Sequence, residues 1–173
     1  MAIRVSSSKR FNIKPLLTFN RNVRYRTCQR IAPSKINTKG LTHLNFAFAE
    51  IDPTNFNIVP TNPGDSALYA QFTALRSAVM QTWIAIGGFD FSSPGPTHST
   101  WSDMASTSAN RSVFISSLVD FMRKWGFQGV ELDWEYPASP TQGGRVEDTQ
   151  NFVSLVAEMR AAFGTNYGIS VTL

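Results

Sequence analysis

The stretch QGVELDWEYP, residues 128–137, alternates apolar and acidic side chains. Successive side chains of a β-strand point to opposite faces, so this stretch predicts a strand over 128–136 with two different faces. Glu131, Asp133 and Glu135 share one face, with no lysine or arginine between them. The other face is apolar or aromatic, at positions 130, 132, 134 and 136.

The segments around this strand alternate between strand-like and helix-like patterns. Further strands are predicted over 41–51 and 82–88, and a fourth begins at 167. The first of these has Leu44, Phe46 and Phe48 on one face and His43, Asn45, Ala47 and Ala49 on the other. Three amphipathic helices are predicted between them, the first of about four turns, the second ending at Gly126, and the third capped by Asp148 and ended by Gly164. Their apolar positions are 68, 72, 75 and 79, then 114, 118, 121 and 125, then 152, 155, 156, 159 and 163.

This order predicts parallel strands joined by helical crossovers, in a doubly wound sheet or a (β/α) barrel. A doubly wound sheet makes its strands apolar on both faces, whereas a barrel turns one face toward its interior, so the acidic face favours a barrel. A half-exposed antiparallel strand would also show this alternation. That alternative fits poorly between two crossover helices, where a strand is usually interior and like charges on one face repel.

A row of acids on an interior face has a chemical use. Neighbouring carboxylates cannot all ionise cheaply, so at least one is expected to stay protonated and able to act as a general acid. Glu135 is the last of the three and lies nearest the carboxyl edge, where parallel α/β folds place their active sites. A proton donor beside negative charge suits the cleavage of a glycosidic bond.

The run from Gly129 to Pro137 closely resembles the signature of family 18 glycoside hydrolases, the chitinases, D-G-x-D-x-D-x-E followed by Tyr-Pro. Residues 44–49 (LNFAFA) and 86–89 (IGGF) resemble the second and third barrel strands of that family. Residues 128–144, with Arg145 just beyond, look most like secreted fungal chitinases. The resemblance covers roughly residues 25–173.

The resemblance implies a TIM barrel and a retaining, substrate-assisted reaction on chitin or chitooligosaccharides, without a cofactor. Glu135 would be the proton donor, and the substrate's own N-acetyl oxygen would be the nucleophile. Asp133 would orient the acetamide and stabilise the oxazolinium-like intermediate, while Glu131 would share a proton with Asp133. Carboxylate spacing does not assign stereochemistry in this class.

Five further residues are predicted to line the sugar subsites: Gly87, Gly88, Phe89, Asp90 and Tyr136. Aromatic faces stack on the apolar side of pyranose rings. Packing is the alternative role for the two aromatic residues, and the glycines would either allow a strained turn or bind through their backbone.

The sequence departs from the family signature at four positions. Gln128 and Glu131 replace motif aspartates, Ala85 stands where a serine is common, and Phe89 replaces a tryptophan. Glu131 is one methylene longer than aspartate, which is expected to misplace the proton exchange with Asp133 and lower the activity.

The net charge of +4 conceals an uneven distribution. Residues 1–40 hold ten bases and no acid, whereas residues 41–173 hold six bases and all twelve acids. We therefore predict a basic, poorly ordered arm over 1–24 and the N-terminal half of a catalytic domain over 25–173. A solvated tail, a targeting segment and a nucleic-acid arm are the alternatives for the arm, and nucleic acid is not expected as a partner because no recognition module accompanies the charge.

Other classes of protein are disfavoured by composition. Cys28 is the only cysteine, and His43 and His98 belong to no metal-ligand motif, so no metal site is predicted. No run of 18 apolar residues predicts a membrane span. The family implies an extracellular protein, although no apolar stretch here is long enough for a secretory signal.

A complete barrel takes about 250 residues, and this chain has 173. The expectation is a partial barrel of roughly strands two to five, with its first strand poorly matched, whose isolated chain is weakly active or inactive. The alternative function is a non-catalytic, chitin-binding lectin on the same fold, and the retained Glu135 argues against it. Oligomeric state and chain-length preference are not predicted, and endo action is suspected.

Overall fold

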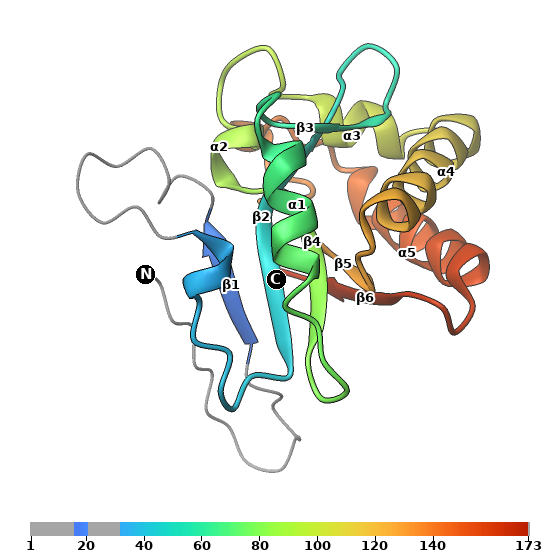
Figure 1. The fold of residues 1–173 in the computed structure, drawn as a ribbon. Helices are drawn as coiled ribbons and strands as arrows, with labels where there is room; N and C mark the ends of the chain where they lie inside the picture. Colours follow the sequence, from blue (N-terminus) through green and yellow to red (C-terminus); the bar gives the residue numbers. More distant parts are fainter. Residues whose placement is uncertain (1–15, 21–31, 173) are drawn as a thin grey trace, which may run out of the picture.

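The computed structural model describes residues 16–20 and 32–172. Strands and helices alternate along most of this region (Figure 1). The strands are β1 Leu16–Asn20, β2 His43–Ile51, β3 Ile58–Pro60, β4 Gln81–Gly87, β5 Gly129–Asp133 and β6 Gly168–Val171. The helices are α1 Asp65–Thr73, α2 Phe89–Ser92, α3 Thr100–Ala105, α4 Ser108–Trp125 and α5 Asp148–Phe163, with single 3-10 turns η2 Pro33–Lys35 and η3 Pro140–Gln142.

The sheet is parallel along its main path, in the order β1-β2-β4-β5-β6, and β3 pairs antiparallel with β2. All the parallel strands therefore end at one edge, where α2 and α3 lie at the top of Figure 1. This is the α/β architecture predicted from the sequence, one part of a (β/α) barrel. The structure adds one strand ahead of the four expected.

That added strand, β1, lies inside residues 1–24, which the sequence predicted to be a poorly ordered basic arm. It pairs with β2 in register from Leu16 opposite His43 to Asn20 opposite Ala47. Phe19 is buried and contacts the rings of Phe46 and Phe72 at centroid distances of 5.8 and 5.9 Å. Part of the predicted arm thus belongs to the sheet, because a short apolar run among the bases is enough to fill an edge position.

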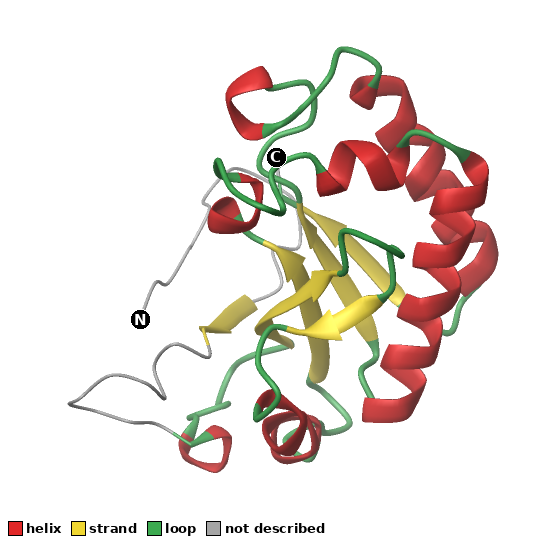
Figure 2. Ribbon diagram, turned by 90° about the horizontal axis from the view of Figure 1, so that it is seen from above, coloured by secondary structure: helices red, strands yellow, loops and turns green. Residues whose placement is uncertain are grey.

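One face of the sheet packs against the helices, and the longer ones lie together on one side of the strands in the view from above (Figure 2). Phe46 on β2 contacts Tyr69 and Phe72 of α1 edge-on, at 4.9 and 5.3 Å between ring centroids. The strand residues on this face are completely buried: Leu44, Phe46, Ile84, Ile86, Val130 and Leu132. Burying such aromatic and branched side chains supplies most of the stability of a domain.

Helix α1 is shorter than predicted. It ends at Thr73, and Val79, which the sequence placed on its buried side, is 77% exposed. The backbone N–H groups of Leu75 and Arg76 donate to carbonyls three residues back, so the last turn tightens and the chain leaves the helix. The apolar period continued past the helix end because Leu75 still packs at the edge of the core.

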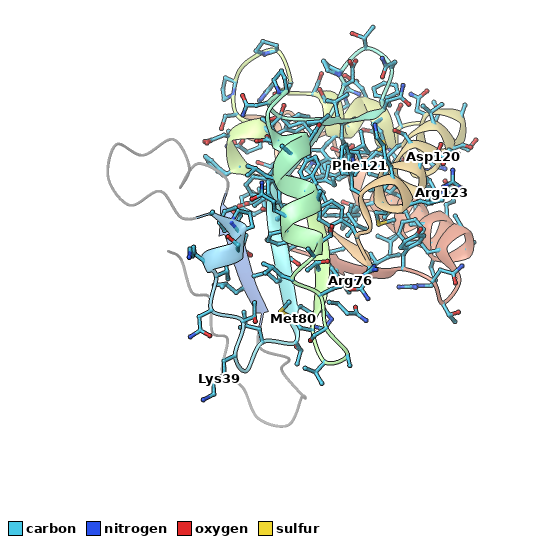
Figure 3. The ribbon with its side chains drawn as sticks, viewed as in Figure 1. Lys39, Arg76, Met80, Asp120, Phe121 and Arg123 are labelled. Atoms are coloured by element: carbon cyan, nitrogen blue, oxygen red, sulfur yellow. The ribbon has the colours of Figure 1, made fainter. Side chains whose placement is uncertain are left out.

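Helices α4 and α5 match the predicted segments more closely. Thr107 caps α4 by accepting a hydrogen bond from the Asn110 N–H, and Gly126 ends it in the left-handed conformation, at φ 80°. Phe121 points from α4 toward the sheet, while Asp120 and Arg123 point outward (Figure 3). None of the described helices is long and apolar enough to cross a membrane.

The start of α5 differs from the prediction in one respect. Asp148 is the first residue of the helix rather than its cap, and the cap position is Glu147, whose side chain makes no capping bond. The Asp148 carboxylate is used for a contact between loops, described below.

Candidate active site

The acidic strand is β5, and its two faces differ in burial. Val130 and Leu132 are completely buried on the helix side. Trp134, just beyond the strand, continues that side, because it stacks on Trp101 of α3 at 5.4 Å and 7° and meets Phe152 of α5 edge-on. The alternation therefore places Glu131, Asp133 and Glu135 on the opposite, inner face, where each is partly exposed.

The lower part of this inner face is filled by Trp83 of β4. Its indole lies over Gly129 and Gly168, so a Cβ at Gly129 would come within 2.5 Å of the ring and one at Gly168 would overlap it. The ring also meets His43 edge-on at 4.9 Å, and its Nε1–H donates to the Gln81 side chain at 2.9 Å. The acids thus stand above an aromatic floor that spans three strands.

The side chain of Asn45 reaches the acid row from β2. Asn45 is completely buried, and its Nδ2 donates a hydrogen bond to Oε2 of Glu131. Ala85, the residue of the intervening strand β4 that pairs in register with Glu131, has only a methyl group as its side chain. Sequence analysis placed Asn45 on the face opposite the apolar residues but did not identify it as a site residue, and only the paired strands bring it to Glu131.

Gly87 and Gly88 let the ends of β4 and β5 approach each other. Both have positive φ, 95° and 92°, which favours glycine. A Cβ on Gly87 would come within 2.8 Å of the Asp133 carbonyl oxygen and of Trp101 Nε1. The Gly88 N–H donates to the Asp133 carbonyl at 2.9 Å. The structure thus uses these glycines to hold Asp133, which is the turn-forming role that the sequence left open.

Aromatic side chains surround the carboxyl ends of these strands. Phe89 at the start of α2 is 50% exposed, Asp90 beside it is exposed, and Tyr136 after β5 is 43% exposed. The Phe48 ring lies against Gly88, where an added Cβ would be 2.9 Å from it. Sequence alternation had grouped Phe48 with the buried Leu44 and Phe46, but the β2–β4 register shifts between Ala47 and Ala49 and breaks that alternation.

The loop from β5 to α5 is tied to α3 by polar contacts. The buried Asp148 accepts from Ser102 Oγ and from the Arg145 backbone N–H, each at 2.6 Å. Arg145 also pairs with Asp103 at 2.6 Å. A Cβ at Gly143 would overlap the His98 carbonyl, so the two loops touch directly. These contacts fix the segment that follows Glu135 and Tyr136.

An ion pair joins the helices behind the site. Arg111 of α4 donates to both carboxylate oxygens of Glu158 of α5, at 2.9 and 2.6 Å, and to the Ala105 carbonyl at 2.8 Å. The hydrogen bond from Arg111 lowers the pKa of Glu158 below its ordinary value. Within the described residues, no three histidine, cysteine or acidic side chains gather in a group that could hold a metal ion.

Comparison with known proteins places this arrangement in a family. The family model for glycosyl hydrolases family 18 matches residues 19–173. Chitotriosidase-1 of Mus musculus is 32% identical over 142 residues, which are 80% of this chain and 29% of that protein. Oviduct-specific glycoprotein of Mesocricetus auratus is 36% identical over 136 residues, which are 77% of this chain and 19% of that protein.

Solved structures agree with the sequence comparisons. Catalytic domain 2 of the Group II chitinase of Ostrinia furnacalis superposes with a TM-score of 0.83 at 29% identity, covering 91% of this chain and 43% of that one. A variant of the same domain is described in complex with penta-N-acetylchitooctaose. This chain spans less than half of each of these three proteins.

The family match covers most of the sequence, including the acidic strand and the glycine turn that resemble the family signature. The mammalian and insect sources of these relatives do not support the finer resemblance to secreted fungal enzymes. The chain belongs to glycosyl hydrolases family 18.

Proposed function

We propose that the acid row of β5 serves the hydrolysis of β-1,4-linked N-acetylglucosamine polymers. The observation that carries this proposal is the position of Glu135. It stands just past the carboxyl end of a parallel strand, on the inner face and above two further acids, while its neighbour Trp134 anchors the chain among the helices. That edge is where (β/α) barrels carry out their chemistry.

In the proposed reaction, Glu135 donates a proton to the glycosidic oxygen as the bond from C1 to that oxygen breaks. The acetamide oxygen of the same sugar attacks C1 and forms an oxazolinium-like ring. Asp133 orients the acetamide and balances its positive charge, and Glu131 exchanges a proton with Asp133. Water then opens the ring as Glu135 takes back a proton, so the configuration at C1 is retained.

The exposed rings at the strand ends suit the sugar chain. Phe89 and Tyr136 present apolar faces on which pyranose rings stack, and Asp90 can accept hydrogen bonds from sugar hydroxyls. Gly87 and Gly88 contribute by shaping this edge rather than through the Gly88 N–H, which already binds Asp133. Endo action stays a prediction.

The test is the hydrolysis of a chitooligosaccharide by the longest natural polypeptide that contains this sequence, because the chain spans 29% of the mouse relative. Glu135→Gln keeps the size of the side chain but removes the acid, and is expected to lower kcat by about 10²- to 10⁴-fold. The exposed Glu147 makes no side-chain capping bond, so Glu147→Gln is the matched control and is expected to stay within about twofold. Equal turnover by the parent and Glu135→Gln would refute the proposed role.

A lectin-like function is the second candidate. The observation in its favour is Glu131, whose extra methylene changes the geometry of its exchange with Asp133. Chitooligosaccharide binding of similar affinity in the parent and Glu135→Gln, with turnover in neither, would support it. A secreted location and a resemblance to fungal enzymes stay predictions.

A further inference from the structure

Asn45 is a polar side chain in a place where strands usually carry apolar ones. It is the third of the nine residues of β2 and is completely buried. Asparagine is depleted both in strands and in interiors, since a buried amide costs free energy unless it is hydrogen-bonded. Its Nδ2 is bonded to Glu131, but its Oδ1 has no partner among the described residues. Packing alone therefore does not explain an asparagine here, because leucine has a similar size and no polar atoms.

The bond to Glu131 crosses a whole strand. Asn45 pairs with Trp83, and Glu131 pairs with Ala85, two residues further along β4, so Asn45 on β2 reaches Glu131 on β5 diagonally across β4. Two strand spacings amount to about 9.6 Å. Ala85, beside Glu131 on β4, adds only a methyl group to this face, and the extra methylene of glutamate helps the carboxylate reach the amide. The short side chain at 85 and the long side chain at 131 are thus both compatible with the hydrogen bond to Asn45.

We propose that Asn45 is a positioning residue for Glu131, holding one of its carboxylate oxygens across β4 so that the other faces Asp133. This inference rests on the proposed function, in which Glu131 exchanges a proton with Asp133. It also reverses the expectation that the longer side chain misplaces that exchange, because the amide fixes the added methylene. In this interpretation three residue types depend on one another: glutamate at 131, alanine at 85 and asparagine at 45.

The chemistry of an amide donor supports this arrangement. The Asn45 N–H groups can only donate, so they bind the ionised carboxylate of Glu131 better than a protonated oxygen. Among the described residues, two further titratable groups on this inner face are Glu135 and His43. Glu135 lies two residues beyond Asp133, and His43 lies two residues before Asn45 and packs its ring against Trp83.

The first test compares turnover in the longest natural polypeptide that contains this sequence. Asn45→Leu is expected to lower kcat by about 10- to 100-fold, the usual loss when a supporting side chain is removed, with KM changed less than about twofold. Glu131→Asp shortens the reach and is expected to cause a similar loss. The double variant is expected to be no slower than the slower single variant, because both changes break one bond.

Rescue separates positioning from a general loss of structure. Ala85 pairs with Glu131, so Ala85→Ser in the Asn45→Leu background supplies a new hydroxyl donor beside the carboxylate and is expected to restore kcat severalfold. Thr82→Val is the matched control, since Thr82 is also completely buried and its Oγ1 has no partner among the described residues. It is expected to leave kcat within about twofold.

Unchanged kcat in Asn45→Leu, additive losses in the double variant, or failure of Ala85→Ser to rescue would each overturn the proposal. A second readout is independent of turnover. It distinguishes failure of the proposed function from failure of the positioning role of Asn45. In the 13C NMR spectrum, Asn45→Leu is expected to shift the side-chain carboxyl resonance of Glu131 and leave that of the exposed Asp90 in place. An unmoved Glu131 resonance would overturn the proposal even in a polypeptide without turnover.

Discussion

Trp83 shows how strongly one side chain constrains its neighbours. Its indole lies across Gly129 on β5 and Gly168 on β6, and neither position has room for a Cβ. Because interiors are packed at nearly crystalline density, a single methyl group here must displace the ring or separate the strands.

We therefore predict that Gly129→Ala lowers the free energy of unfolding by about 1–3 kcal/mol, the usual cost of overpacking. Urea denaturation followed by far-UV circular dichroism measures it. Gly64→Ala is the control, because Gly64 has an ordinary backbone conformation, at φ −76°, and nothing lies within 4 Å of its added Cβ. Equal stability of Gly129→Ala and the parent would contradict the packing described for Trp83.

The residues of the candidate site differ in how far the sequence alone predicts them. The faces of Glu131, Asp133 and Glu135 follow from alternation alone. Asn45 reaches Glu131 only because the strands pair, and Trp101 reaches Trp134 only because α3 packs beside β5. No local sequence pattern encodes either contact. The register shift between Ala47 and Ala49 interrupts the alternation that had grouped Phe48 with Leu44 and Phe46.

The elements around the site are joined by two polar contacts of different kinds. The first is the hydrogen bond that Ser102 of α3 donates to the buried carboxylate of Asp148, the first residue of α5. Removing its donor leaves a buried carboxylate oxygen with one partner fewer, which costs more than an ordinary exposed hydrogen bond.

Ser102→Ala is expected to lower the free energy of unfolding by about 1–3 kcal/mol. It is also expected to speed amide hydrogen exchange over residues 138–147, since that loop is tied down through Asp148. Ser106→Ala is the control: its hydroxyl donates to the Asp103 carbonyl at an exposed position. Exchange rates in the loop that match those of the parent would show that the Ser102 contact does not hold it.

The second contact is the Arg111–Glu158 pair. Arg111 lowers the pKa of Glu158 in the folded state, so between the lowered and the ordinary value the unfolded state binds more protons. The pair therefore stabilises the fold at neutral pH, and its contribution is lost as the pH falls from the ordinary glutamate range through the lowered pKa.

Glu158→Gln is expected to cost about 1 kcal/mol at neutral pH, a modest value because the Glu158 side chain is 37% exposed. Below the ordinary pKa of glutamate, the difference between variant and parent is expected to shrink. Thermal melts across pH 2–7, a range chosen to span about two units either side of that pKa, measure it. Asp120→Asn removes the exposed Arg123–Asp120 pair and is expected to change stability by less than about 0.5 kcal/mol. A constant difference at all pH values would contradict the role assigned to Glu158.

The helices show where patterns predict well and where they fail. The end of α4 was predicted at Gly126 because a left-handed glycine is a local signal. The end of α1 was placed too late, because Leu75 continued the apolar period while the backbone had already tightened at Thr73.

At the scale of the whole molecule, the sheet has two outer strands. Within residues 16–20 and 32–172, β1 pairs with β2 and β6 pairs with β5, and neither has a second neighbour. The first of these strands was missed in the sequence because basic residues flank it, whereas Leu17 and Phe19 pack into the core.

Outer strands with free backbone groups favour pairing between chains. The 173-residue polypeptide is therefore expected to self-associate with rising concentration, as measured by sedimentation velocity. Val171→Lys places a charge on β6 and is expected to reduce this association. A single sedimentation coefficient for the parent from micromolar to millimolar protein would contradict the expectation.

The stacked pair Trp101–Trp134 also gives the molecule an intrinsic optical probe. Two nearly coplanar indoles this close couple their electronic transitions, and the resulting exciton signal depends steeply on their mutual angle. Trp134 sits between Asp133 and Glu135 along the chain. Ultraviolet spectra can therefore follow rearrangements of the segment around the acid row, without any attached label.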